Sequence, residues 1–122
     1  MLILKPDVRI TGLRPEIVLA VLVAERAYAE IGCELMVTSG IEGAHSRGSF
    51  HYAGSAVDFR TLNVPTDKLN PLVEKIRSAL GPDFDVVLES NPSHLHSVQC
   101  CVMWSGAAPM AAHGPMQLLY ST

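Results

Sequence analysis

The sequence predicts an α+β fold in which helices pack on one side of a small, mainly antiparallel β-sheet. Two segments carry apolar residues at the spacing of a helix face, and four short segments have the β-branched and apolar composition of strands. Their order along the chain is helix, strand, strand, helix, strand, strand. This order is typical of α+β domains, in which helices and strands are not strictly alternated.

Length and composition predict a single domain that spans residues 1–122. Hydrophobic residues make up 48% of the 122, which is enough for a folded core. The formal net charge is -3 without a basic stripe, so nucleic acid is not an expected partner. We find no apolar run near the ~20 residues of a membrane span, and no basic region leading into an apolar run as in a secretory signal. We therefore expect synthesis in the cytoplasm.

The first helix is expected to begin near Leu13 and to end at Gly32. Pro15 suits its first turn, and Glu16 lies where the helix dipole favours a negative charge. Its apolar positions are three or four residues apart and trace one face: Ile17, Val21, Ala24, Tyr28 and Ile31. Residues 34–39 then predict a strand, because Val37 and Thr38 are β-branched.

Residues 40–54 form a long stretch rich in Gly, Ser and His with little periodicity, which predicts a loop that is either functional or disordered. A second strand is expected over residues 55–60. The second helix ends near Leu80, but its start has two alternatives. Either Asn70 caps it and Pro71 is its first residue, or Thr66 caps it and Pro71 bends it.

Residues 84–89 predict the third strand, and His94 to about Met103 the fourth. The turn residues Asn91 and Pro92 between them predict a hairpin. The tail after Trp104 has no clear period and receives no element.

The three cysteines, Cys33, Cys100 and Cys101, are a poor disulfide framework, because their number is odd and two are adjacent. We expect reduced and mostly buried thiols. Cys100 would share a strand face with His96, but at roughly 13 Å along the strand it is too far away to bind the same ion unless the strand breaks.

His51 and Asp58 lie seven residues apart, one in the loop and one on the second strand. Gly54 between them lets the chain turn, so that an imidazole and a carboxylate could converge on a metal ion. Taken alone, such a pair is more often a surface histidine and a solvated aspartate.

His94 and His96 would point to one face of a strand, with Cα atoms roughly 6–7 Å apart. An isolated pair of this kind is as often an exposed polar pair as a binding site. Two clusters of histidine in a chain with five histidines favour a metal site on the sheet and the adjoining loop.

Four further residues are candidates for the chemistry of that site. Glu89 ends the third strand and could accept a proton from water, or it is a solvated hairpin glutamate. His45 could stabilise an oxyanion, although a plain loop histidine is nearly as common. Arg47 could meet a substrate carboxylate, and Ser49 shapes the same loop.

The chain carries two motifs, Ser49-x-His51-x-x-Gly54-x-Ala56-x-Asp58 and His94-Leu95-His96. The first resembles, at every fixed position, the motif of the zinc D-alanyl-D-alanine peptidases, which include D,D-carboxypeptidases and phage L-alanyl-D-glutamate endopeptidases. The second resembles the His-x-His of many members of the wider superfamily, which also holds lysostaphin-type enzymes and the hedgehog signalling domain.

The resemblance implies that Zn²⁺ is bound by His51, Asp58 and His96. His94 would line the site, while likeness to the hedgehog domain points to His45 and Glu89 as catalytic groups around the metal. Arg47 and Ser49 would contact the substrate. Two positions depart from the family, since many members carry an acidic base where this chain has Ser93, and an arginine where it has Ile41 and Glu42.

The resemblance implies a zinc metallopeptidase that hydrolyses bacterial peptidoglycan stem peptides. Such a protein would reach the cell wall on lysis or in a phage particle. The alternative is a zinc-bearing binding or structural protein on the same scaffold without turnover, which the hedgehog likeness and Ser93 keep open. The sequence indicates neither which bond is cut nor the oligomeric state.

Overall fold

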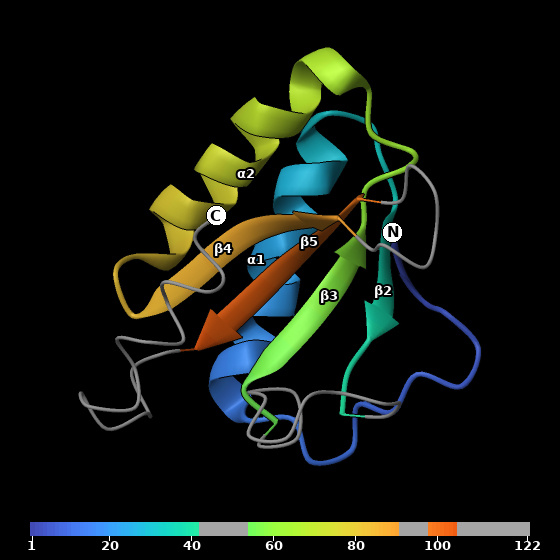
Figure 1. The fold of residues 1–122 in the computed structure, drawn as a ribbon, viewed down its shortest axis with the longest axis vertical. Coiled ribbons are helices and arrows are strands. Elements are labelled where there is room, and N and C mark those ends of the chain that lie inside the picture. The colour runs from blue at the N-terminus through green and yellow to red at the C-terminus, as the bar shows by residue number, and fades with distance from the viewer. Residues whose placement is uncertain (42–53, 91–97, 105–122) are drawn as a thin grey trace.

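The computed structural model describes residues 1–41, 54–90 and 98–104 (Figure 1). Helices and strands in these ranges follow the order β1 (Leu2–Leu4), α1 (Pro15–Glu30), β2 (Leu35–Ser39), β3 (Ala56–Arg60), α2 (Thr66–Leu80), β4 (Phe84–Ser90) and β5 (Val98–Trp104). Neither helix is long and apolar enough to cross a membrane.

The strands form one five-stranded sheet with the order β1-β2-β3-β5-β4. Only the β1–β2 pair is parallel, so the prediction of a mainly antiparallel sheet is confirmed. The predicted hairpin is confirmed as well, because β4 pairs with β5 from Phe84↔Trp104 to Ser90↔Val98. β5 lies between β3 and β4 although it follows both in the sequence.

Helix α1 begins at Pro15 and buries the face that the apolar spacing predicts. Buried on this helix are Ile17, Ala20, Val21, Ala24, Ala27 and Tyr28. Ile31 already has non-helical dihedral angles as the C-terminal cap, and Gly32 follows at a φ of 74°. A positive φ is unfavourable for other residues, so this glycine explains why the helix ends there.

Helix α2 takes the longer of its two predicted extents. It runs from Thr66 with Pro65 at the N-terminal cap, so Thr66 is its first residue rather than its cap. Pro71 lies inside it on the exposed side, while Leu72 and Val73 beside it are buried.

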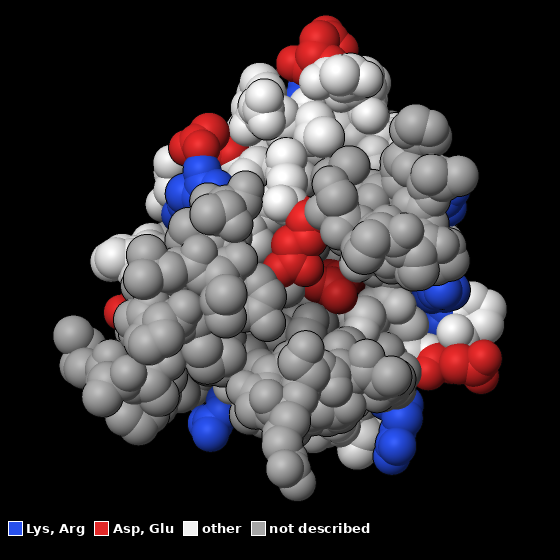
Figure 2. Space-filling view, in the orientation of Figure 1, with Lys and Arg blue, Asp and Glu red and all other residues white. Residues whose placement is uncertain are grey.

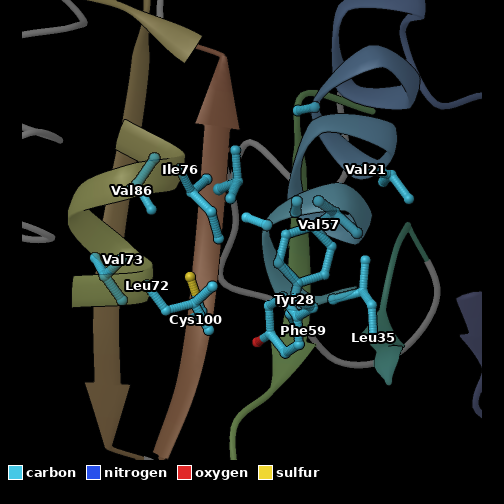
Figure 3. Packing of buried hydrophobic residues seen from close by; sticks show 14 of the residues in the cluster. Val21, Tyr28, Leu35, Val57, Phe59, Leu72, Val73, Ile76, Val86 and Cys100 are labelled. Atoms are coloured by element: carbon cyan, nitrogen blue, oxygen red, sulfur yellow. The ribbon is translucent and has the colours of Figure 1, made fainter. Parts of the chain in front are cut away.

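Both helices pack on the same face of the sheet. One hydrophobic core joins buried residues of α1 and α2 to every second residue of the strands, among them Val57, Val86 and Cys100 (Figure 3). At its centre the rings of Tyr28 and Phe59 meet edge to face, 6.4 Å between centroids. The opposite, helix-free face carries a small apolar cluster of Ala56, Cys101 and Met103 with Val87 beside it.

Candidate metal centre

Strand alternation places two carboxylates and a thiol on the helix-free face. On β3, Val57 and Phe59 belong to the core under the helices, so Asp58 between them points to the other side. On β5, Cys101 likewise points away from the core, because its neighbours Cys100 and Val102 belong to it.

The strand register then brings these groups together. Asp58 lies directly opposite Cys101 across β3 and β5. Val87 lies opposite Cys101 from the other side, so Glu89 is a diagonal neighbour of the thiol. One carboxylate oxygen of Asp58, one of Glu89 and the sulfur of Cys101 all lie within 4.8 Å of one another. Acidic side chains accordingly lie near the middle of this face, over the sheet (Figure 2).

The donor set of this triad fits a divalent cation. Carboxylate oxygen and thiolate sulfur are both ligands that Zn²⁺ accepts, and mixed sets of this kind also bind other transition metals. Asp58 and Cys101 are buried, with 7% and 1% of their surface exposed, whereas Glu89 is partly exposed. Two members of the triad, Asp58 and Cys101, are therefore buried, and the carboxylate of Glu89 lies nearer to solvent.

Burial raises the pKa of the Cys101 thiol well above its ordinary value. The negative charges of Asp58 and Glu89 act in the same direction, as does a hydrogen bond between the thiol and the Asp58 side chain. Without a metal, Cys101 is a protonated thiol that donates to the Asp58 carboxylate. Metal coordination by Cys101 itself would require that proton to leave.

Comparisons with protein-family models, with curated proteins and with solved structures find no match for this chain. The interpretation of the centre therefore depends on its own residues and on the elements that hold them.

Gly54 fixes the start of the strand that carries Asp58. Its φ is 72°, and its carbonyl accepts a hydrogen bond of 2.9 Å from the backbone N–H of Arg14. A Cβ at this position would lie 2.3 Å from the carbonyl oxygen of Gly12. Two local features thus require a glycine at this position of the long motif. Its φ is positive, and the backbone of Gly12 lies too close to leave room for a Cβ.

An irregularity in β2 lies opposite Asp58. The pairing runs Val37↔Phe59 and then Ser39↔Asp58, so the register shifts between these positions. Thr38 lies at this shift, and its hydroxyl donates to the backbone carbonyl of Asp58 at 3.3 Å. Such bulges locally re-aim side chains, and they are frequent beside functional sites.

Of the residues selected from the sequence, the structure brings together Asp58 and Glu89. The other predictions lie outside the described residues: His45, Arg47, Ser49 and His51 in residues 42–53, and His94 and His96 in residues 91–97.

Cys101 is the member of the triad that the sequence analysis did not select. Cys100, which shares a predicted strand face with His96, is not part of the triad. In the structure Cys100 faces the helices, 1% exposed, and burial raises the pKa of its thiol to about 12. The adjacency of the two cysteines was the available signal, because neighbours on a strand face opposite sides.

Proposed function

We propose that this chain is a zinc-dependent peptidase that hydrolyses stem peptides of bacterial peptidoglycan. The observation that supports this proposal is the convergence of Asp58 and Glu89, which are far apart in the sequence but meet on one sheet face with Cys101. The long motif assigns a metal-binding role to Asp58, and the hedgehog likeness assigns a proton-transfer role to Glu89. Their proximity is what those two roles require.

The two histidine-bearing segments are joined along the chain to strands that carry this centre. Residues 42–53, which contain His51, lead through Gly54 and Ser55 into β3 and so to Asp58. Residues 91–97, which contain His96, connect Ser90 to Val98, and these two residues are directly paired. The proposed ligands are His51, Asp58 and His96, with the Cys101 thiol orienting the carboxylate of Asp58.

A zinc ion in this centre would polarise the scissile carbonyl and lower the pKa of its water to about 7. Glu89 is the residue placed to take a proton from the attacking water. As the new C–O bond forms and the C–N bond breaks, the same proton passes to the leaving amine. His45 or His94 stabilises the oxyanion, and Arg47 and Ser49 position the peptide.

Metal content, measured by mass spectrometry, tests the site separately from catalysis. We expect about one zinc per chain, as for a catalytic site of three protein ligands, and loss of that zinc in Asp58→Asn. Asp85→Asn is the matched control, because Asp85 lies on the same strand as Glu89 but outside the triad. A wild-type protein without zinc, even after reconstitution, would contradict the proposal.

Digestion of peptidoglycan then tests the chemistry. We expect the wild type to release peptide fragments with new amino termini, and Glu89→Gln to keep zinc while losing this release. Retained cleavage in Glu89→Gln would exclude Glu89 as the proton-transfer group.

Cys101 supports a second candidate function, a zinc-bearing binding protein without turnover. If its sulfur coordinates the ion together with the other proposed ligands, the site has four protein ligands, as in structural zinc sites. Cobalt substitution distinguishes the two candidates. A thiolate-to-cobalt charge-transfer band, together with no cleavage of any stem peptide, would favour the binding protein, whereas the peptidase proposal expects no such band.

A further inference from the structure

The outer edge of β1 has no partner strand among the described residues. β1 pairs with β2 on its inner side, where the backbone N–H of Lys5 donates to the carbonyl of Val37 at 3.0 Å just beyond the strand. Backbone groups alternate in direction along a strand, so those of Leu2 and Leu4 point away from β2. An unpaired edge of this kind is a template for another strand.

The opposite edge of the sheet is protected. At β4, the guanidinium of Arg77 donates to the backbone carbonyl of Val86 at 2.6 Å, and α2 packs beside the strand. Capping an edge carbonyl with a charged side chain is one way in which proteins prevent association at sheet edges. Within the described residues the two edges of this sheet therefore differ, because a charged side chain caps a carbonyl of β4 whereas β1 has a partner strand on one side.

An apolar groove lies next to this open edge. It has a volume of about 350 Å³, and every residue that lines it is apolar. Leu2 and Leu4 of β1 form one wall, and Val18 and Leu22 of α1 form the other. Leu22 is 56% exposed, and Leu19 beside the groove on the same helix is 58% exposed. No charged residue lines the groove, so another apolar surface can cover it without burying a charge.

The size of this surface suits a dimer interface. Six large apolar residues on β1, at Ile10 and on α1 are each 40–58% exposed: Leu2, Leu4, Ile10, Val18, Leu19 and Leu22. Burying them would supply most of the about 800 Å² that each partner contributes to a standard interface.

We propose that the partner of this surface is a second copy of the chain. The two β1 strands pair antiparallel about a twofold axis at Ile3, so that Leu2 of each copy lies opposite Leu4 of the other. In this register the outward backbone groups of Leu2 and Leu4 exchange hydrogen bonds as closely spaced pairs. The sheets join into one, and the groove of each copy receives apolar side chains of the other. This inference is independent of the proposed peptidase function.

Sedimentation velocity of the full chain over a range of micromolar concentrations tests the proposal. We expect a reversible dimer of 13.2 kDa chains. Leu22→Glu places a charge in the groove, and Leu4→Pro removes an N–H that points away from β2, so each should raise the dissociation constant at least tenfold. Ala79→Glu is the matched control, because it adds the same charge at an exposed position of α2 and should leave the dimer intact.

Circular dichroism of each variant verifies that it is folded. If Leu4→Pro fails to fold, the dissociation constant of Leu22→Glu alone tests the proposed dimer. A monomeric wild type at the highest concentration would overturn the proposal and indicate that this surface is covered by another partner. A dimer that Leu22→Glu leaves as tight as the wild type would overturn it too.

Discussion

Two glycines of this chain have nearly the same backbone conformation but different surroundings. Gly54 has a φ of 72° and Gly32 a φ of 74°. A Cβ on Gly32 would meet nothing within 4 Å, whereas a Cβ on Gly54 would lie 2.3 Å from the Gly12 carbonyl oxygen. A side chain at either position would adopt an unfavourable positive φ. Only at Gly54 would it also have to push two backbone segments apart.

We expect Gly54→Ala to lower the free energy of unfolding by about 3 kcal/mol and Gly32→Ala by only about 1–2 kcal/mol. Both alanines would have an unfavourable positive φ, but only the alanine at position 54 would also clash with the backbone. Urea titrations of the two variants and the wild type measure the difference. Equal losses in the two variants would show that the approach of Gly54 to Gly12 relaxes without cost.

Asp58 is the residue on which the candidate metal centre depends most. The thiol of Cys101 donates to its side chain, and the hydroxyl of Thr38 donates to its backbone carbonyl. The small Ala56, fully buried two residues earlier on the same face, leaves room beside Cys101 and Met103. These neighbours reduce the number of conformations open to the carboxylate, which favours metal binding because less entropy is lost on coordination.

At the scale of elements, the sequence predicts the helices and strands whose own residues show the spacing or composition typical of that element. The buried face of α1 and the β-branched residues of β2 are local signals, and the structure has both. β1 has no such signal, since Leu2–Leu4 is a run of three apolar residues whose partner among the described strands is a parallel strand more than thirty residues later. Its existence depends on a long-range pairing that no local pattern indicates.

Helix α2 contains a proline that the sequence analysis treated as a reason for two alternatives. Pro71 lacks the N–H that would donate to the Asp67 carbonyl one turn earlier. The helix nevertheless continues through it, because Leu72, Val73 and Ile76 bury their side chains in the core. Tertiary packing thus outweighs the local propensity at this position.

Replacing Pro71 by alanine is expected to raise the free energy of unfolding by about 1–3 kcal/mol, because the missing hydrogen bond is restored at an exposed position. Thermal and urea unfolding provide the measurement. Ser78→Ala, another exposed position of α2, should change stability by no more than about 0.5 kcal/mol. A lower free energy of unfolding in Pro71→Ala would show that Pro71 stabilises the native helix.

At the scale of the whole molecule, the sequence identifies members of the candidate centre but not their arrangement. Asp58 and Glu89 were both selected, from a motif and from a strand end. Their proximity depends on β5 lying between β3 and β4, and Cys101 joins them only through the register of that strand. Register is set by contacts between distant segments, so a single sequence does not reveal it.

The core makes the stability of the whole molecule sensitive to alkali. Burial raises the pKa of Tyr28 above its ordinary 10.0, and raises the pKa of Cys100 from 9.0 to about 12. The unfolded chain loses these protons at the ordinary values while the native chain keeps them. The corresponding stability is fully present below about pH 9 and is lost as the pH rises above it.

We expect the free energy of unfolding to fall above about pH 10 by roughly 1.4 kcal/mol per pH unit for each of these groups. Urea titrations at a series of pH values measure the slope. Tyr28→Phe is the informative variant, since it removes the ionisable hydroxyl together with its 2.8 Å hydrogen bond to the Arg60 carbonyl. Its slope should be shallower, and an unchanged slope would exclude Tyr28 as a source.

The position of β5 in the sheet has a consequence for the order of assembly. β3 and β4 do not pair with each other, and both make their antiparallel ladders with β5, which is the last of the described strands to leave the ribosome. Until β5 pairs with β3, Asp58 and Glu89 belong to strands that are not joined, and closing the long loop between β3 and β5 is slow. The candidate metal centre therefore comes together only in the step that completes the sheet.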